Sequence, residues 1–349
     1  MTKILVFDTE TTGLPERKHA SFVKQKEHER SLLKDISLWS NSIEKYPSII
    51  QLAYILYDTD NPSDSKIYNK YIDIPETIQI SEESHKIHHI SKEKIKSMDT
   101  FSKAYIKDSL KEFMRDFAEA DVVVGHNVDF DRRMIIAEFL RLFAVSDADT
   151  DANSDADSDA NITHIMELMK DENFECTQEI TTPICNLKSK FEYIDPKTKI
   201  PKYIYKIKSA KLIEAYRHYF GYTPDGEHMH DAIIDVVVCL RVYGMSFPGE
   251  QAFDVCDTNS KIRELILKVS PLNPQTCEHT KHYLAQHRGF VVPGTFQVDD
   301  KSKHASATEK HASASKTKSA SEKSHETHAS ASKTKSNEKS NKSNNEEDI

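Results

Sequence analysis

The stretch KILVFDTETTGLP, residues 3–15, decides the fold of this 349-residue chain. ILVF at 4–7 is an apolar run typical of a short buried strand, and Asp8 and Glu10 follow it two residues apart. Because side chains alternate along a strand, both carboxylates project from the same face. TTGLP then predicts a turn. An acidic site is therefore expected where a buried strand ends.

Periodicity predicts a mixed α/β domain around this strand. Alternating β-rich segments at 49–58 and 66–74 flank an Asn-Pro-Ser-Asp turn, and we expect them to form a hairpin. DVVVGHN at 121–127 predicts a buried strand, and FECT at 174–177 predicts a short one. Helical spacing of apolar residues predicts helices at 101–120, 131–144, 208–220, 230–244 and 260–269.

Two more polar clusters lie at the ends of predicted elements, HNVDFD at 126–131 and HDAIID at 230–235. Converging carboxylates are the ligands that hard divalent cations prefer, and a two-metal site can activate water against a phosphodiester. A nearby histidine supplies a base that titrates near neutral pH. The residues alone leave Asp129 and Asp131 both open as the second-cluster acid.

In this order the three clusters resemble the motifs of the DEDDh (DnaQ-like) 3′–5′ exonucleases. VFDTETTGLP, HNVDFD and HDAIIDV carry the resemblance, and YPSIIQLAYILYD and KIHHIS support it. The resemblance covers roughly residues 1–245, apart from two insertions. It implies an RNase H-like α/β fold, with a mixed sheet whose first strands are antiparallel and helices on both faces.

The resemblance also implies the site residues. Metal ligands would be Asp8, Glu10, Asp131 and Asp235, holding two Mg²⁺ ions for which Mn²⁺ can substitute. His230 would be the general base, because the family's five-residue spacing to the last acid selects it over His228. The tyrosine-based sister group would need Tyr where Asp231 stands. The expected substrate contacts are Thr9, Thr11, Leu14, Phe130 and His88. Core packing is the alternative for Leu14 and Phe130, and helix capping or packing is the alternative for His88.

The implied activity is metal-dependent 3′–5′ exonuclease action on single-stranded or frayed 3′ ends, releasing nucleoside 5′-monophosphates. DNA is the first choice of substrate. An RNA exonuclease or oligoribonuclease of the same chemistry is the alternative, and a non-catalytic nucleic-acid-binding module is the alternative from a different class. A replication or repair protein is an expected partner.

Low-complexity segments divide the chain further. We expect an exonuclease domain at 1–250 with insertions near 17–45 and 146–161, a helical extension at 251–298 and a disordered tail at 299–349. The tail repeats HASASKTKS and is weakly basic, so it is read as a tether or a solvated segment. The acidic insertion lacks the glycine and closing glutamate of a calcium loop.

Composition excludes other classes of protein. The chain has 47 basic and 56 acidic residues, a net charge of −9 and a mean hydropathy of −0.61, so a strongly basic nucleic-acid coat is excluded. Eight lysines within 188–211, with Arg132 and Arg133, predict a local track for phosphates or a solvated loop and helix face. Five scattered cysteines and the lack of a long apolar run predict an intracellular protein, cytoplasmic or nuclear, with no membrane span and no zinc site.

Overall fold

The computed structural model describes residues 2–39, 42–149, 163–224, 229–247 and 251–269. All of them belong to one unit, Met1–Phe296. The predictions for the acidic insertion from 150 onward, for the extension beyond 269, for the tail and for His228 lie outside the described residues.

A six-stranded mixed sheet forms the centre, in the order β4-β3-β2-β1-β5-β6. Its strands are β1 (Lys3–Thr11), β2 (Ile49–Asp58), β3 (Lys66–Ile72), β4 (Lys103–Ala104), β5 (Val122–Gly125) and β6 (Phe174–Cys176). β1, β2 and β3 are antiparallel neighbours, whereas β5 runs parallel to β1 and β6 parallel to β5. The predicted mixed sheet, hairpin and RNase H-like fold are confirmed.

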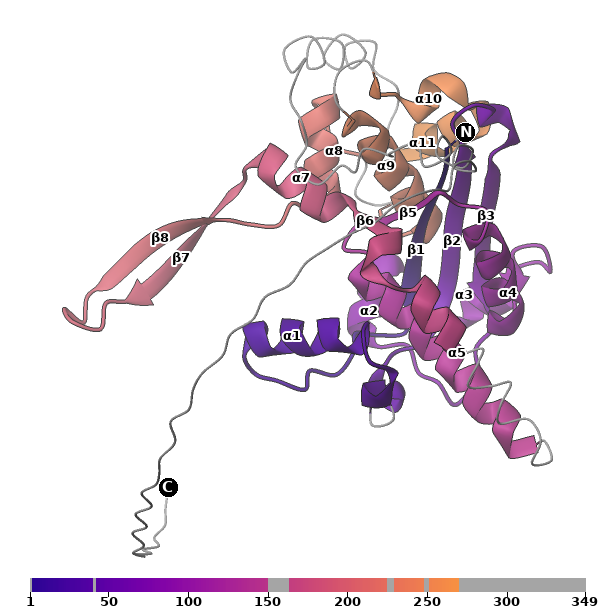
Figure 1. Cartoon of the computed structure of the whole chain (residues 1–349), viewed down its shortest axis with the longest axis horizontal. Helices are drawn as coiled ribbons and strands as arrows, with labels where there is room; N and C mark the ends of the chain where they lie inside the picture. The colour runs from indigo at the N-terminus through magenta and orange to yellow at the C-terminus, as the bar shows by residue number, and fades with distance from the viewer. Residues whose placement is uncertain (1, 40–41, 150–162, 225–228, 248–250, 270–349) are drawn as a thin grey trace, which may run out of the picture. The chain divides into compact units, whose positions relative to one another are not determined.

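Helices cover both faces of this sheet (Figure 1). They are α1 (Phe22–Leu32), α2 (Glu82–His88), α3 (Lys92–Ser97), α4 (Ile106–Phe117), α5 (Asp129–Asp149), a helical segment at 163–168, α7 (Thr177–Cys185), α8 (Leu212–Phe220), α9 (Ala232–Met245), α10 (Val255–Thr258) and α11 (Ser260–Val269). Short 3₁₀ turns occur at Ile36–Trp39, Ile43–Lys45, Pro62–Asp64 and Asp171–Asn173. No helix among the described residues is both long and apolar enough for a membrane span.

The alternation of β1 divides the core into two clusters. Ile4 and Val6 pack in the cluster that contains α8 and α9, whereas Leu5 and Phe7 pack in the cluster that contains α4 and α5. A strand buried on both faces reads as a continuous apolar run, as ILVF does. The same alternation carries Asp8 and Glu10 toward the α9 face, and it turns Thr9 toward α5.

Several predicted helix boundaries are corrected. Predicted helix 101–120 shortens to α4, and predicted helix 208–220 begins only at Leu212. α5 starts at Asp129 and continues to Asp149, so the first residues of the predicted acidic insertion are helical. α9 begins at Ala232, because His230 has φ of 69° and the preceding cap, Asp231, is extended.

The insertion at 17–45 is more than a polar surface segment. It forms α1 and buries Trp39, whose Nε1 donates to the carbonyl of Leu32 at 2.8 Å. The Trp39 ring packs 4.7 Å from the ring of Tyr46, and both join the α5-side core. Burying an aromatic side chain of this size stabilises the fold by roughly 1.5–3 kcal/mol. This part of the insertion is therefore structural.

The lysine-rich segment is a β-hairpin, which corrects the prediction of a loop followed by a helix face. β7 (Lys188–Ile194) and β8 (Pro201–Ile207) pair antiparallel as a separate two-stranded sheet. In Figure 1 the hairpin extends away from the central sheet.

Candidate active site

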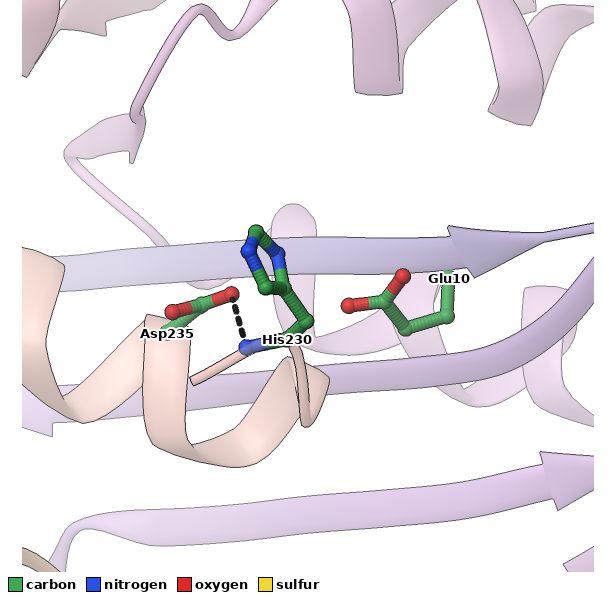
Figure 2. A group of neighbouring side chains, drawn as sticks. All are labelled: Glu10, His230 and Asp235. Atoms are coloured by element: carbon green, nitrogen blue, oxygen red, sulfur yellow. Dashed lines mark hydrogen bonds between the residues drawn. The ribbon is translucent and has the colours of Figure 1, made fainter. Parts of the chain in front are cut away.

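Three of the predicted site residues converge at the end of β1. One ligand atom each from Glu10, His230 and Asp235 lies within 4.8 Å of the other two. Figure 2 shows the carboxylate of Glu10, on the strand, pointing toward the other two side chains at the start of α9. β1 and α9 pack directly on each other, so the cluster depends on packing between residues more than 200 positions apart.

A strained turn positions His230 over the start of α9. His230 has a positive φ, which is uncommon outside glycine, and its backbone N–H donates to Oδ2 of Asp235 at 3.2 Å (Figure 2). This bond ties the turn to the first helical turn of α9. The imidazole is exposed, so it can reach a bound substrate.

The second-motif acid is fixed from the other face of β1. Oδ1 of Asp131, in the first turn of α5, accepts from the backbone N–H of Thr9 at 3.0 Å and from its hydroxyl at 2.7 Å. Asp131 is buried, whereas Asp129 bonds to Arg132 at 2.8 Å. The structure thus places Asp131, and not Asp129, against the strand that carries Asp8 and Glu10.

Burial raises the pKa values of all four acids, and repulsion from neighbouring carboxylates adds to it for Asp8, Glu10 and Asp235. Burial is the largest cause in each case. The pKa of Glu10 rises to about 9, with Asp235 and Asp131 adding repulsion, and that of Asp8 rises well above its ordinary value. Burial raises the pKa of Asp131 to about 7 despite the Thr9 hydrogen bonds, and it raises the pKa of Asp235 to about 7.

These acids fit a divalent metal centre. Oδ1 of Asp235 is buried without a hydrogen-bond partner among the described residues, an arrangement that is costly unless a cation or water satisfies it. Mg²⁺ and Mn²⁺ prefer carboxylate oxygens, and their charge offsets the repulsion that raises the pKa values. The donor chemistry therefore fits a divalent metal ion, with Asp8, Glu10, Asp131 and Asp235 as candidate ligands.

The other predicted contacts separate into two groups. The hydroxyl of Thr9 bonds Asp131 and that of Thr11 bonds the carbonyl of Gly13 at 2.7 Å, so both are engaged internally. Leu14 is 78% exposed in the turn after β1 and is free to meet a substrate. Phe130 is half-buried against the α5-side core. These placements favour Leu14 as a substrate contact and indicate a structural role for Thr9 and Thr11.

His88 contacts the end of β1, at Thr11. Its Nδ1 accepts from the N–H of Ile90 at 3.0 Å, which leaves Nε2 to donate to the carbonyl of Thr11 at 3.2 Å. Burial lowers the pKa of His88 to about 4, so the ring is neutral. It also lines a hollow of about 400 Å³ shared with His230. His88 holds the end of β1 in place beside this hollow.

The predicted phosphate-binding role of two arginines is wrong. Arg132 and Arg133 are 1% and 4% exposed. Arg132 bonds Asp129 and stacks on the ring of Phe174, and Arg133 pairs with Glu29 at 3.5 Å. Both guanidinium groups are therefore committed to the protein interior.

Two further polar residues support the site and were not predicted. Gln51, fully buried on β2 opposite Glu10, donates to Oδ1 of Asp231 at 2.7 Å and accepts from the N–H of Ala232 at 3.3 Å. A glutamine within the apolar strand IIQLAYILYD is the signal that could have identified it. His126, in the second motif, bonds the hydroxyl of Thr177 and donates to the carbonyl of Ala210 at 3.1 Å.

Comparison with known proteins gives the same assignment. A family model described as Exonuclease (RNase_T) matches residues 5–243. A search of curated proteins found no match. Solved structures that match part of the chain include cell-death related nuclease 4 (CRN-4; 13% identity, TM-score 0.37, covering 69% of this chain and 62% of that one) and E. coli Exonuclease I in complex with a 5cy-dT13 oligonucleotide (13% identity, TM-score 0.40, covering 69% of this chain and 39% of that one). This chain thus spans less than two thirds of either protein. Because the family model matches more than half of the chain, and the acidic motifs meet at one site, the chain belongs to the DEDDh-type exonuclease family of nucleases.

Proposed function

We propose that the chain is a metal-dependent 3′–5′ exonuclease that removes nucleoside 5′-monophosphates from the 3′ end of DNA. The observation that carries the proposal is the convergence of Glu10, Asp235 and His230 at the end of β1, with Asp8 and Asp131 coupled to the same cluster by charge. A non-catalytic module on this fold would be expected to lack at least one of the five, and all five are present.

The acids and the histidine have different roles in this proposal. Asp8, Glu10, Asp131 and Asp235 hold two Mg²⁺ ions, for which Mn²⁺ can substitute. When bound, such ions lower the pKa of water and neutralise charge on the phosphate. His230 takes the proton of the attacking water. Its pKa is lowered, first by desolvation and then by the positive charges of Lys211 and His89, so the ring is neutral and able to accept a proton at pH 7.

The substrate end is assigned from the turn after β1. Leu14 is exposed four residues after Glu10 and would pack against the terminal base, while the acidic cluster meets the last phosphodiester. DNA is our first assignment, and RNA is the alternative with the same chemistry. Single-stranded or frayed ends fit, because a terminal base must be unstacked to reach the turn.

Matched 20-nucleotide DNA and RNA oligonucleotides test this proposal. Each is labelled at its 5′ end and incubated with the full chain in Mg²⁺, Mn²⁺ or EDTA. We expect a metal-dependent ladder that shortens from the 3′ end and a 5′-monophosphate product. A phosphorothioate bond at the 3′ end should block it.

The Asp8→Asn variant is the inactive control, and Asp129→Asn is the matched control at a neighbouring acid outside the cluster. Cleavage that begins at the 5′ end or persists in EDTA would contradict the proposal. Faster degradation of RNA would change the substrate assignment from DNA to RNA and leave the proposed reaction unchanged.

A further inference from the structure

The β7–β8 hairpin is a long exposed ribbon with no role in the core. Every residue of its two strands except Ser189 is exposed. Seven-residue strands at about 3.3 Å per residue make the ribbon about 20 Å long. An isolated two-stranded hairpin is marginally stable in water, so this ribbon contributes little to the stability of the fold. Its side chains are available to bind something else.

Positive charge is concentrated on this ribbon. Residues 188–207 contain six lysines against Glu192 and Asp195, a net charge of +4 in a chain whose total is −9. The remaining residues therefore carry −13. Lys202 pairs with Asp195 and Lys208 with Glu214, whereas Lys188, Lys190, Lys197, Lys199 and Lys206 pair with no carboxylate among the described residues. The ribbon presents unneutralised ammonium groups in an otherwise acidic protein.

Aromatic rings are interleaved with these lysines on both faces. The register sets Lys190 opposite Tyr205 on one face and Tyr193 opposite Lys202 on the other. Lys190 lies 3.5 Å from the ring centroid of Tyr203. The exposed aromatic side chains of the two strands are Phe191, Tyr193, Tyr203 and Tyr205, between 41% and 67% exposed. Alternating cations and exposed rings suit a polyanion with accessible aromatic bases.

The root of the ribbon is attached to the active site. Three residues after the end of β8, the carbonyl of Ala210 accepts from His126 of the second motif, and the N–H of Ala210 donates to the hydroxyl of Thr182 at 3.0 Å. A strand whose end occupies the active site could therefore continue along the ribbon.

We propose that the β7–β8 hairpin is a binding arm for an unpaired nucleic-acid strand, holding nucleotides that lie upstream of the terminal one. The lysines contact phosphates, and the tyrosines and phenylalanine stack on bases. Duplex DNA fits less well, because its bases are stacked on one another and leave the rings nothing to cover. The route of the strand into the site rests on the proposed function, but binding to the arm does not.

Binding is tested in the full chain carrying Asp8→Asn, so that the probe is not degraded. The probe is a fluorescent 20-nucleotide single strand in EDTA, measured by anisotropy over a range of salt. Lys190→Gln with Lys206→Gln should weaken binding and reduce the slope of log K against log salt by about 1.4, at about 0.7 for each phosphate contact. Tyr203→Ser with Tyr205→Ser should weaken it at least about 5-fold for each base unstacked. Lys107→Gln with Lys111→Gln, exposed on α4, is the matched control and should change neither.

Turnover separates the arm from the active site. In the otherwise native chain, both hairpin variants should keep the dinucleotide rate and raise KM for the 20-mer about 10-fold. An equal loss on the dinucleotide would overturn the proposal, because the hairpin would then act through the structure of the site. Unchanged affinity for the 20-mer in the hairpin variants would also overturn the proposal. So would a native dimer that Tyr203→Ser with Tyr205→Ser dissociates without weakening nucleic-acid binding, because the hairpin would then be a dimer interface. Tight, hairpin-dependent binding by a native chain that cleaves nothing would uphold the arm and refute the exonuclease assignment.

Discussion

Replacing Glu10 by glutamine should stabilise the metal-free protein. The raised pKa of Glu10 means that the folded chain keeps its proton between pH 4.5 and about 9, where the unfolded chain has lost it. Stability without metal therefore falls as pH rises through this window. At pH 7 the interval above 4.5 amounts to about 3 kcal/mol, at about 1.4 kcal/mol per pH unit. This is an upper limit, because the other acids readjust. The neutral amide removes the penalty and keeps the shape.

Thermal unfolding in EDTA measures this effect. At about 2–4 °C per kcal/mol, the Glu10→Gln variant should melt up to about 12 °C above the native chain at pH 7 and level with it near pH 4. Mg²⁺ at about 100 times its Kd should stabilise the native chain by about 2.7 kcal/mol, and the variant by less. Glu44→Gln, at an exposed glutamate, is the control. Equal pH dependence in the native and Glu10→Gln chains, or a variant that melts lower at pH 7, would refute the electrostatic account.

Three further outcomes are expected. Thr9→Val removes the hydroxyl hydrogen bond to Asp131, and such a bond to a charged acceptor contributes about 1.5–3 kcal/mol. We therefore expect kcat to fall at least about 10-fold, and to fall less in the Thr11→Val control. His230→Ala should lower kcat by about 10²–10⁴-fold while Mg²⁺ binding, measured by calorimetry, persists; native turnover would remove His230 as the base. Gln51→Ala should lower kcat with little change in KM, and steady-state kinetics on a short oligonucleotide measure it.

Local periodicity predicted the parts of the site that depend on one element. Two-residue alternation is enough to put Asp8 and Glu10 on one face, and the structure sets Ile4 and Val6 on the same side of β1. Residue charge alone did not predict which cationic side chains are exposed. Arg132 and Arg133 looked like surface cations, but their interior partners lie far along the chain and could not be read from a single sequence.

Backbone conformation accounts for the other differences. The residues of HDAIIDV fit a helix throughout, and nothing in their order shows that His230 adopts a positive φ and precedes it. The hairpin at 188–207 was missed because its lysines obscured the period-two pattern of KFEYI and YIYKI. Polar residues on both faces of a ribbon remove the apolar alternation that identifies a half-buried strand.

Gln51 shows how such a site is held by a residue that never touches substrate. Its amide donates to Asp231 and to Asn69, and its carbonyl accepts the first free N–H of α9, at Ala232. Removing it leaves buried polar groups unpaired, at about 1–3 kcal/mol each, and frees the turn that carries His230. If Gln51 were only structural, its replacement would lower Tm and leave kcat unchanged. A positioning role predicts a lower kcat even when the assay temperature is well below Tm. Asn69→Ala breaks only the bond to β3 and is the matched control, so equal losses in kcat for the two variants would refute this role.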